Sequence, residues 1–492
     1  MKRGIHIIFD AIEVDFWVYK TLEIIIKEHS DFEVTYSIHG AKDLSLKKYL
    51  FSKIKVISSW FYPSAYEKNI KKKSIYTLLD SNARIKGINS KSTIINFSNR
   101  NIINESNLCI IEFRYGDDYC IDNKLFGWNE LGNGSLLLGS YLVEKRLNET
   151  KVIFYTFSSY HNFAIKRSID SHLFKQVHAL SRFLTASKPS YYQNITEYIN
   201  KPSKQHSSLF VCAKLIKACL IKFAKSERKV TRKWSLAISN KYFDRDVSNF
   251  KIISPPNDYF WADPFVLNDD NGTNIFIEEK KIKTHNGYIS LLILEEDKAY
   301  TKKIIEEKYH LSYPHVFKFN SEYYMFTESL ENKTINLYKS SSYPTDWKFE
   351  KYIFSDIQAV DPTLIKHNGV WWLFVNQRKN SYESIQDELY IYYSDDPTST
   401  NWSSHKLNPV VSDVRTSRPA GKIINHNGKL IRPSQNSQKR YGYSLNFMEI
   451  IKLNTYEYEE QLIEKLEPWN SEIQALHTFS TAKGKTLIDI II

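Results

Sequence analysis

Five segments in the C-terminal half place a reactive side chain at the same point of a repeated pattern. They begin "ADPFV" at 262, "YPHVF" at 313, "VDPTLI" at 360, "SRPAGKII" at 417 and "LHTFS" at 476, and they carry Asp263, His315, Asp361, Arg418 and His477. Acidic, basic and imidazole groups that share a concave site shift one another's pKa values and can transfer protons. The pattern predicts a catalytic or binding site, provided that the fold brings these residues together.

A second polar set ends the strand that follows each segment. Its members are Glu278 or Glu279, Glu328, Asn376 or Gln377, and Gln435, with Arg432 close by. Glu328 follows an apolar run, where an unpaired carboxylate would be costly. Arginine presents a fork of donors that suits phosphate or carboxylate, so Arg418 and Arg432 are candidate ligands for a phosphorylated substrate.

Each candidate also has a structural interpretation. Asp-Pro is a common turn element, and the two histidines could be hydrogen-bonded core residues. The two arginines could form ion pairs with nearby aspartates, and the aromatic residues of the repeat could pack within it.

The elements that must position these residues form a repeat of about 50 residues, which indicates a repeat architecture. Each unit consists of a polar-capped strand, a turn, a second strand and a third strand. Five units predict a five-bladed β-propeller over residues 245–492, and "NFKIISP" near residue 249 supplies the missing strand of the last blade. First strands begin beside the axis and second strands return to it, so both polar sets converge at the centre.

The first half of the chain shows a different pattern of expected secondary structure. Over residues 1–200, strand patterns such as "GIHIIFD" and "SKIKVISSW" alternate with helical ones such as "IDSHLFKQVHALSRFL". This alternation predicts a Rossmann-type α/β domain with a largely parallel sheet. Residues 201–244 form a basic linker that contains an amphipathic helix. That helix could lie on anionic lipid or pack on a domain as an ordinary surface helix.

Composition narrows the class of protein. The chain has 492 residues, a net charge of +12 and four cysteines without metal-binding spacing, so we expect two domains and reduced thiols. The N-terminus reads as a strand, not a signal peptide. No nucleic-acid-binding motif accompanies the positive charge. We therefore expect a cytoplasmic protein, with peripheral binding to the inner face of the cytoplasmic membrane as an option.

The propeller segments resemble a known family. "HLSYPHVFKFNSEYYMFTES", "DPTLIKHNGVWWLFV", "LNPVVSDVRTSRPAGK", "LIRPSQNSQKRYG" and "ALHTF" are similar to the propeller domain named after the N-terminal part of plant glucosamine inositolphosphorylceramide transferase. The resemblance implies sugar chemistry and, for bacterial members, capsule or O-antigen synthesis. It also implies a distant likeness to arabinofuranosidase and invertase propellers, in which carboxylic acids flank the sugar. Asp263 and Asp361 match two of these acids by position, whereas Glu328 is not a clean match for the glutamate of those enzymes.

The N-terminal half is more weakly similar to a formyltransferase-like domain. The motif His-x-His-Gly-Asp of such domains is replaced by Phe113-Arg114-Tyr115-Gly116-Asp117. Formyl transfer needs a histidine that polarises the carbonyl and manages protons. The resemblance therefore implies a domain that has lost this activity and keeps a binding or structural role.

These observations leave three hypotheses. The first is a glycosyltransferase for surface polysaccharide that uses an activated sugar donor and a glycan or lipid-linked acceptor, with no firmly implied cofactor or metal. Asp263 or Asp361 would be the base, Glu328 and His315 would orient hydroxyls, and Arg418 and Arg432 would hold phosphate. Glu279, Gln435 and His477 would complete the substrate site. The second is a glycoside hydrolase that uses Asp263 with Glu328 or a neighbouring glutamate, and the third is a non-catalytic glycan-binding scaffold.

Overall fold

The structure is a computed structural model with two compact units, one of residues 1–228 with 381–383 and one of residues 229–380 with 384–492. It describes residues 3–29, 31–40, 46–61, 72–79, 92–99, 102, 108–116, 120, 125–147, 149–185, 207, 210–217, 233–269, 272–295 and 298–492. Asp117 and most of the basic linker lie outside these ranges. Among the described helices, none is long and apolar enough to cross a membrane.

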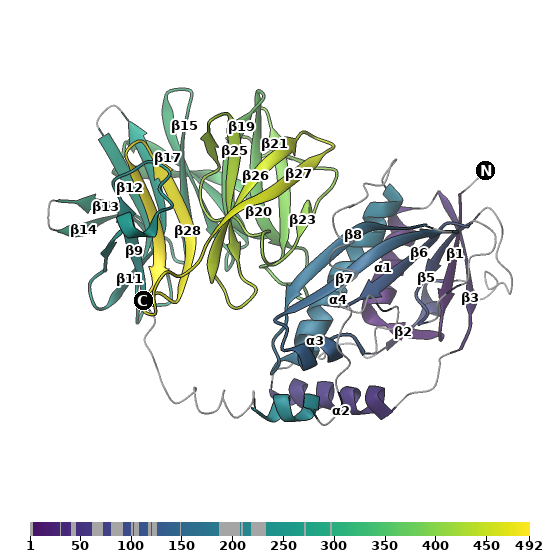
Figure 1. Ribbon diagram of the computed structural model, residues 1–492. Helices are drawn as coiled ribbons and strands as arrows, with labels where there is room; N and C mark the ends of the chain where they lie inside the picture. Colours follow the sequence, from purple (N-terminus) through teal and green to yellow (C-terminus); the bar gives the residue numbers. More distant parts are fainter. Residues whose placement is uncertain are drawn as a thin grey trace. The chain divides into compact units, whose positions relative to one another are not determined.

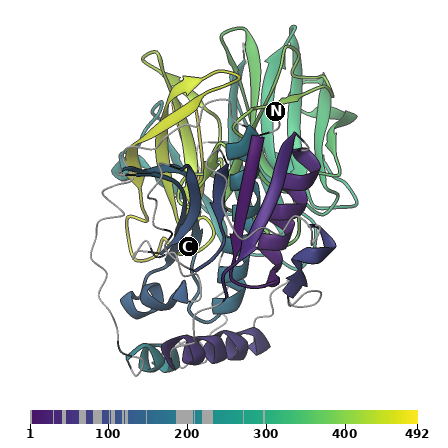
Figure 2. The same ribbon diagram turned by 90° about the vertical axis from the view of Figure 1, so that its right-hand side faces the viewer.

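The N-terminal unit is built on a mixed sheet (Figures 1 and 2). Its strand order is β3 (Phe32–Ile38), β1 (Arg3–Phe9), β5 (Thr93–Asn96), β6 (Ile110–Tyr115), β7 (Leu137–Arg146) and β8 (Glu149–Ser159). The first four strands are parallel, but β7 and β8 are antiparallel to their neighbours. The prediction of a largely parallel sheet is therefore correct for one half of the sheet and wrong for the other. A short pair, β2 (Glu13–Asp15) and β4 (Lys72–Ser74), lies apart from it.

Helices α1 (Phe16–Glu28) and α4 (Ile165–Thr185) share a hydrophobic core with this sheet. In α1, Val18, Leu22 and Ile25 are buried at helical spacing. The remaining helices are α2 (Leu46–Phe61), the short α3 (Trp128–Asn133) and a 3-10 turn at Ile75–Thr77. The formyltransferase resemblance stays a prediction.

The segment "SKIKVISSW" is helical, not a strand, because it forms most of α2. Phe51 and Ser58 are buried, whereas Tyr49 and Val56 are exposed. This burial follows the helical period, so the β-branched residues at 54–57 misled the prediction. In the basic linker, residues 210–217 are helical. Val211 is fully buried in the core of the N-terminal unit, and Lys214 Nζ donates to the carbonyl of Gly132 at 2.7 Å.

The C-terminal unit is a five-bladed β-propeller whose strands pair antiparallel within each blade (Figure 1). Blade one contains β11 (Tyr259–Asp269), β12 (Gly272–Lys281), β13 (Tyr288–Leu294) and β14 (Ala299–Ile305). Blade two contains β15 (Ser312–Phe319), β16 (Glu322–Ser329), β17 (Thr334–Ser342) and β18 (Asp346–Ser355). Blade three contains β19 (Gln358–His367), β20 (Val370–Arg378), β21 (Glu388–Ser394), β22 (Ser403–Ser404) and β23 (Val411–Ser412). Blade four contains β24 (Ile424–His426), β25 (Lys429–Asn436), β26 (Ser444–Leu453) and β27 (Tyr458–Leu466).

Blade five joins the two ends of the propeller. Its order is β28 (Ala475–Ala482), β29 (Lys485–Ile491), β9 (Trp234–Ser239) and β10 (Lys251–Ile253). The segment "NFKIISP" does enter this blade, as β10 at its outer edge. The strand that pairs with β29 is β9, which lies within the range expected for the linker. The ring therefore begins before residue 245.

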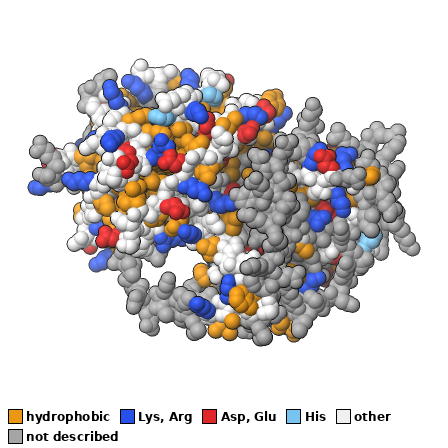
Figure 3. Space-filling view, in the orientation of Figure 1, with side chains coloured by type: hydrophobic (Ala, Val, Ile, Leu, Met, Phe, Trp, Pro, Cys, Tyr) orange, Lys and Arg blue, Asp and Glu red, His pale blue; other side chains and the backbone are white. Residues whose placement is uncertain are grey.

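The innermost strands of four blades share an irregularity at the point where they approach the axis. Their pairing with the second strand shifts register between Ala262 and Phe265, Ser312 and His315, Val360 and Thr363, and Leu476 and Phe479. Three residues in these bulges, Asp263, Tyr313 and Asp361, have positive φ of 47°, 54° and 57°, and each precedes a proline. Bulges re-aim side chains, and aspartate tolerates this backbone region better than most residues. On the outside of the propeller, basic and acidic side chains are interspersed on the face that Figure 3 shows.

Candidate functional site

The centre of the propeller contains a buried ion pair between blades three and four. Arg418 donates from Nε and Nη2 to the two oxygens of Asp361, with Nη2 at 3.2 Å from Oδ1. Gln435 Nε2 donates to Oδ2 of Asp361 at 3.2 Å, and Arg418 Nη1 donates to Gln386 Oε1 at 2.8 Å. Asp361 and Arg418 are 3% and 6% exposed. Three N–H donors on one carboxylate stabilise its negative charge.

Asp263 faces the same centre from blade one with a different environment. Its oxygens accept from Thr478 Oγ1 at 2.8 Å and from the Tyr313 amide at 3.3 Å. Burial, together with the charges of Glu278, Asp489 and Asp361, raises the pKa of Asp263 to about 8 against the opposing effect of His477. This carboxyl is therefore largely protonated at neutral pH and can donate a proton.

His477 is held on blade five by a carboxylate that the sequence analysis missed. Its Nδ1 lies 2.6 Å from Oδ2 of Asp489, and its Nε2 lies 3.7 Å from Oδ1 of Asp263. Burial alone would lower the pKa of His477, but the charges of Asp489, Asp263 and Asp361 raise it to about 9. His477 is thus an imidazolium at neutral pH. An acid inside the apolar run "LIDIII" was the signal for Asp489, because a buried carboxylate needs a partner.

Glu328 supports the ion pair from blade two. Its Oε2 accepts from the backbone amide of Asp361, and its Oε1 accepts from Ser312 Oγ at 3.0 Å. Burial and the neighbouring charge of Asp361 hold the pKa of Glu328 well above its usual range, although Arg418 opposes this. Glu328 therefore adds a further buried carboxyl group beside the Asp361–Arg418 pair.

Three predicted site residues do not join this cluster. Arg432 is fully buried and donates to Glu460 at 2.9 and 2.7 Å and to two backbone carbonyls, so it holds blade four together instead of a phosphate. Glu279 accepts from Trp261 Nε1, Ser290 Oγ and Thr301 Oγ1 within blade one. Its neighbour Glu278 lies on the opposite face of β12, because successive strand residues point to opposite faces, and there its charge acts on Asp263.

His315 is the third predicted site residue that does not join the cluster, and the bulge in β15 explains its position. The residue that corresponds to Asp263 and Asp361 is Tyr313, whereas His315 lies two residues further along the strand. There its Nε2 accepts from the Leu364 amide at 3.4 Å, and its ring contacts Phe265 at a centroid distance of 5.3 Å. Burial and the nearby ammonium of Lys422 hold the pKa of His315 well below its ordinary value, so this histidine is neutral.

Two aromatic residues cover the cluster. Trp234 stacks on the His477 ring at 4.1 Å, and the Arg418 guanidinium lies 4.7 Å from the centre of the Tyr441 ring. Tyr441 is 43% exposed, so its ring offers an apolar face on which a sugar could stack. From the sequence, the aromatic residues of the repeat were expected to pack within it, and Trp234 lies in the range expected for the linker.

Asp263, His477 and Asp489 are also close enough to share a metal ion, with one ligand atom of each within 4.8 Å of the others. Both oxygens of Asp489 are already engaged, because they accept from the backbone amides of Asp263, His477 and Thr478. The centre also places the Arg418-paired carboxylate of Asp361 near the largely protonated Asp263, an arrangement that suits proton transfer to and from hydroxyl groups.

Comparison with known proteins confirms the predicted resemblance for the propeller. Residues 245–475 match the family model described as glucosamine inositolphosphorylceramide transferase 1, N-terminal. The chain is 32% identical over 206 residues to glucosamine inositolphosphorylceramide transferase 1 of Oryza sativa subsp. japonica and, again over 206 residues, to that of Arabidopsis thaliana. These matches cover 41% of this chain and 27% of each relative, so the chain spans about a quarter of the length of the curated relatives.

Among solved structures, the chain is similar to Zg3597, a family 117 glycoside hydrolase of Zobellia galactanivorans. The TM-score is 0.36 and the identity 11%, over 53% of this chain and 90% of that chain.

Proposed function

Since its propeller is related to glucosamine inositolphosphorylceramide transferase 1, we propose that the chain is a sugar transferase whose chemistry takes place at the central cluster. The observation that supports this most directly is the Asp361–Arg418 pair beside Asp263. A transfer between sugar and hydroxyl needs a base for the attacking oxygen and an acid for the departing one. The cluster supplies both from buried groups with fixed geometry.

The roles follow from the charges. Asp361, paired with Arg418 and oriented by Gln435, is the base that accepts the proton of the acceptor hydroxyl. Asp263, protonated at neutral pH, is the acid or hydrogen-bond donor to the departing oxygen. The imidazolium of His477 provides positive charge on the far side of Asp263. A phosphate of the donor would then interact with Arg418 alone, since Arg432 is bound to Glu460.

We extend the proposal to an activated sugar donor, a glycan or lipid-linked acceptor and a role in bacterial surface polysaccharide such as capsule or O-antigen. The family resemblance supports the substrates, and the basic residues 201–233 support a place on the inner face of the cytoplasmic membrane. The N-terminal unit would serve as a binding domain without formyl transfer, because Phe113 and Tyr115 stand where histidines are expected and both are buried.

The test is donor consumption by the full chain with a panel of sugar nucleotides, preselected by thermal shift because a true donor stabilises the folded state. We expect Asp361→Asn to reduce the transfer rate by about 10²- to 10⁴-fold, the usual contribution of a general base. Glu322→Gln, at an exposed position of blade two, is the matched control and should keep the wild-type rate. Transfer that survives in folded Asp361→Asn would exclude the central cluster as the reaction site.

A glycoside hydrolase is the second candidate. A protonated carboxyl near an ionised one is the arrangement that glycosidases use, with water as the acceptor, and Asp263 and Asp361 meet this requirement. Chromogenic furanosides and pyranosides, offered without any activated donor, separate the two functions. Turnover that is lost in both Asp263→Asn and Asp361→Asn would favour hydrolysis over transfer.

A further inference from the structure

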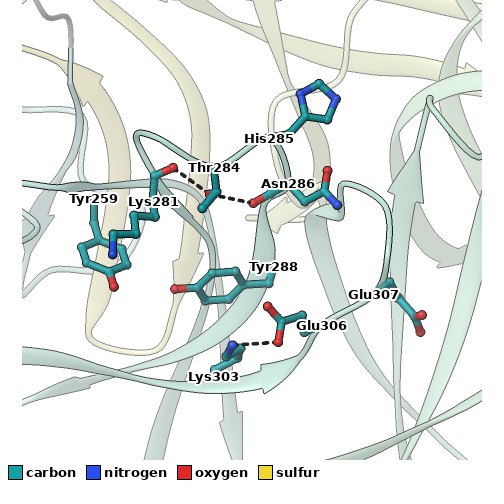
Figure 4. A pocket seen from close by; sticks show the side chains of 9 residues that line it. All are labelled: Tyr259, Lys281, Thr284, His285, Asn286, Tyr288, Lys303, Glu306 and Glu307. Atoms are coloured by element: carbon teal, nitrogen blue, oxygen red, sulfur yellow. Dashed lines mark hydrogen bonds and ion pairs between the residues drawn. The ribbon is translucent and has the colours of Figure 1, made fainter.

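Blade one contains a pocket that the proposed reaction does not use (Figure 4). It has a volume of about 350 Å³ and lies where β11 begins, β12 ends and β13 begins. Tyr259 and Tyr288 form part of its wall, and Thr284, His285 and Asn286 line it from the connecting loop. This volume is at the lower end of the range for ligand sites, about 300 to 1,000 Å³, so the pocket suits a small ligand or one unit of a larger one.

The charges of the lining favour an uncharged ligand. Two lysines, Lys281 and Lys303, are balanced by Glu306 and Glu307. Lys303 is neutralised by Glu306 at 2.7 Å and also lies 4.8 Å from the centre of the Tyr288 ring. A phosphate or carboxylate site would carry an excess of positive charge.

The polar groups of the lining suit hydroxyls. Hydroxyl, amide, imidazole and phenol groups include both donors and acceptors, as a sugar hydroxyl itself does. The tyrosine rings add apolar surface of the kind that packs on the C–H face of a sugar. Thr284 Oγ1 donates to the Lys281 carbonyl at 2.8 Å, which orders the loop around the pocket.

The pocket lies at the same end of β11 as Asp263 of the central cluster. Tyr259 precedes Asp263 by four residues on β11, which is about 13 Å along a strand. The loop is also linked to Glu278 through His310, because the Gly287 amide donates to His310 Nδ1 at 2.8 Å and His310 Nε2 lies 3.2 Å from Oε1 of Glu278. The charge of Glu278 in turn acts on Asp263. An oligosaccharide that extends along this end of β11 could reach both places.

We propose that the blade-one pocket is a subsite that binds a neutral sugar residue of the glycan acceptor, next to the residue that reacts at the centre. The assignment of that sugar to the acceptor rests on the proposed transferase function. The binding of a neutral sugar rests on the pocket alone, so it can be measured without donor or turnover.

The test is saturation-transfer NMR of the full chain with maltotriose, cellotriose and the N-acetylglucosamine trimer. We expect binding of at least one trisaccharide and a loss of affinity of about tenfold in Tyr259→Ala, as expected for a lost aromatic contact. His285→Ala, at an exposed loop position that cannot unfold the blade, should weaken the same ligand. Tyr456→Ala, which removes an exposed tyrosine of blade four, should bind as the wild type does.

The outcomes separate this inference from the proposed function. If no trisaccharide binds, or if both pocket variants bind as the wild type does, the subsite is refuted whether or not transfer is observed. If binding depends on Tyr259 and His285 but no sugar donor is consumed, the sugar site stands and the transferase proposal falls.

Discussion

Replacing Arg418 by Met would leave the Asp361 carboxylate in the buried centre with Gln435 as its remaining side-chain donor in the described part of the chain. The pair is bidentate, and its side chains are 7% and 4% exposed, so water cannot replace the lost guanidinium. Glu328, which accepts from the Asp361 amide, offers no positive charge in compensation. The folded state therefore has to accommodate an uncompensated charge.

The size of the effect follows from burial. Removing one partner of a buried ion pair typically destabilises a protein by about 3 to 5 kcal/mol. For a unit the size of this propeller, about 2 to 4 °C of melting temperature corresponds to each kcal/mol. We therefore expect the propeller transition of Arg418→Met to fall by about 6 to 20 °C. The partly exposed pair Lys339–Glu322 gives a contrast, since surface pairs contribute about 1 kcal/mol or less.

The assay is differential scanning calorimetry of the intact chain for the wild type, Arg418→Met, Asp361→Asn, the double variant and Lys339→Met as control. The double variant should lose less than the sum of the two single variants, because Asn at 361 leaves no charge to compensate. A shift in Arg418→Met no larger than that of Lys339→Met, or strict additivity in the double variant, would refute the idea of a coupled buried pair.

Three further predictions concern stability and its dependence on pH. The raised pKa of His477, about 9, means that its stabilising charge is fully present below pH 6.5 and is lost as the pH rises through 9. The His477→Gln variant should therefore show a weaker dependence of melting temperature on pH between pH 6.5 and 9. A dependence as steep as that of the wild type would contradict the assignment. Burial lowers the pKa of Lys422 to about 7, so its charge is unfavourable in the folded state; Lys422→Met should raise the melting temperature most below pH 7, with a gain that shrinks toward pH 10, and a gain independent of pH would argue against this. Arg432→Met should destabilise the propeller by about 3 to 5 kcal/mol through the loss of its pair with Glu460. Its affinity for the sugar donor, measured by calorimetry on the folded variant, should not change. A selective loss of donor affinity would show instead that Arg432 belongs to the substrate site.

The repeat was visible in the sequence because each blade reuses the same strand order and places a polar residue at the axis. That logic brought Asp361, Arg418 and Gln435 into one hydrogen-bonded group with Glu328, and it placed Asp263 close enough for the charge of Asp361 to act on it. Counting along the repeat works as long as the strands pair in regular register.

Counting failed where the backbone departs from regularity. Because of the bulge, Tyr313 occupies the position at which the pattern suggested His315. A single step along a strand also separates Glu278, which faces the cluster, from Glu279, which is bonded within the blade. The sequence does not reveal this bulge, because tyrosine has no preference for positive φ that would mark the position.

Contacts between residues far apart in the chain could not be predicted from the sequence either. Glu460, on the outermost strand of blade four, is the partner of Arg432 at a distance of 28 residues, and Trp234 reaches His477 only because β9 completes blade five. Such contacts depend on which strands are neighbours in space. The mixed N-terminal sheet shows the same limit, because β7 and β8 have strand patterns that do not encode their direction.

Blade five has a consequence for the order in which the molecule can be completed. Strands β9 and β10 are the first of the propeller to leave the ribosome, but the segment that pairs with β9 begins only at Lys485. The 231 residues between Ile253 and Lys485 take about 12 to 46 seconds to synthesise at usual rates. During that time β9 presents an unpaired hydrogen-bonding edge, the kind of surface at which chains aggregate. Nascent chains that stall before the final hairpin should therefore be the species that depends most on chaperones.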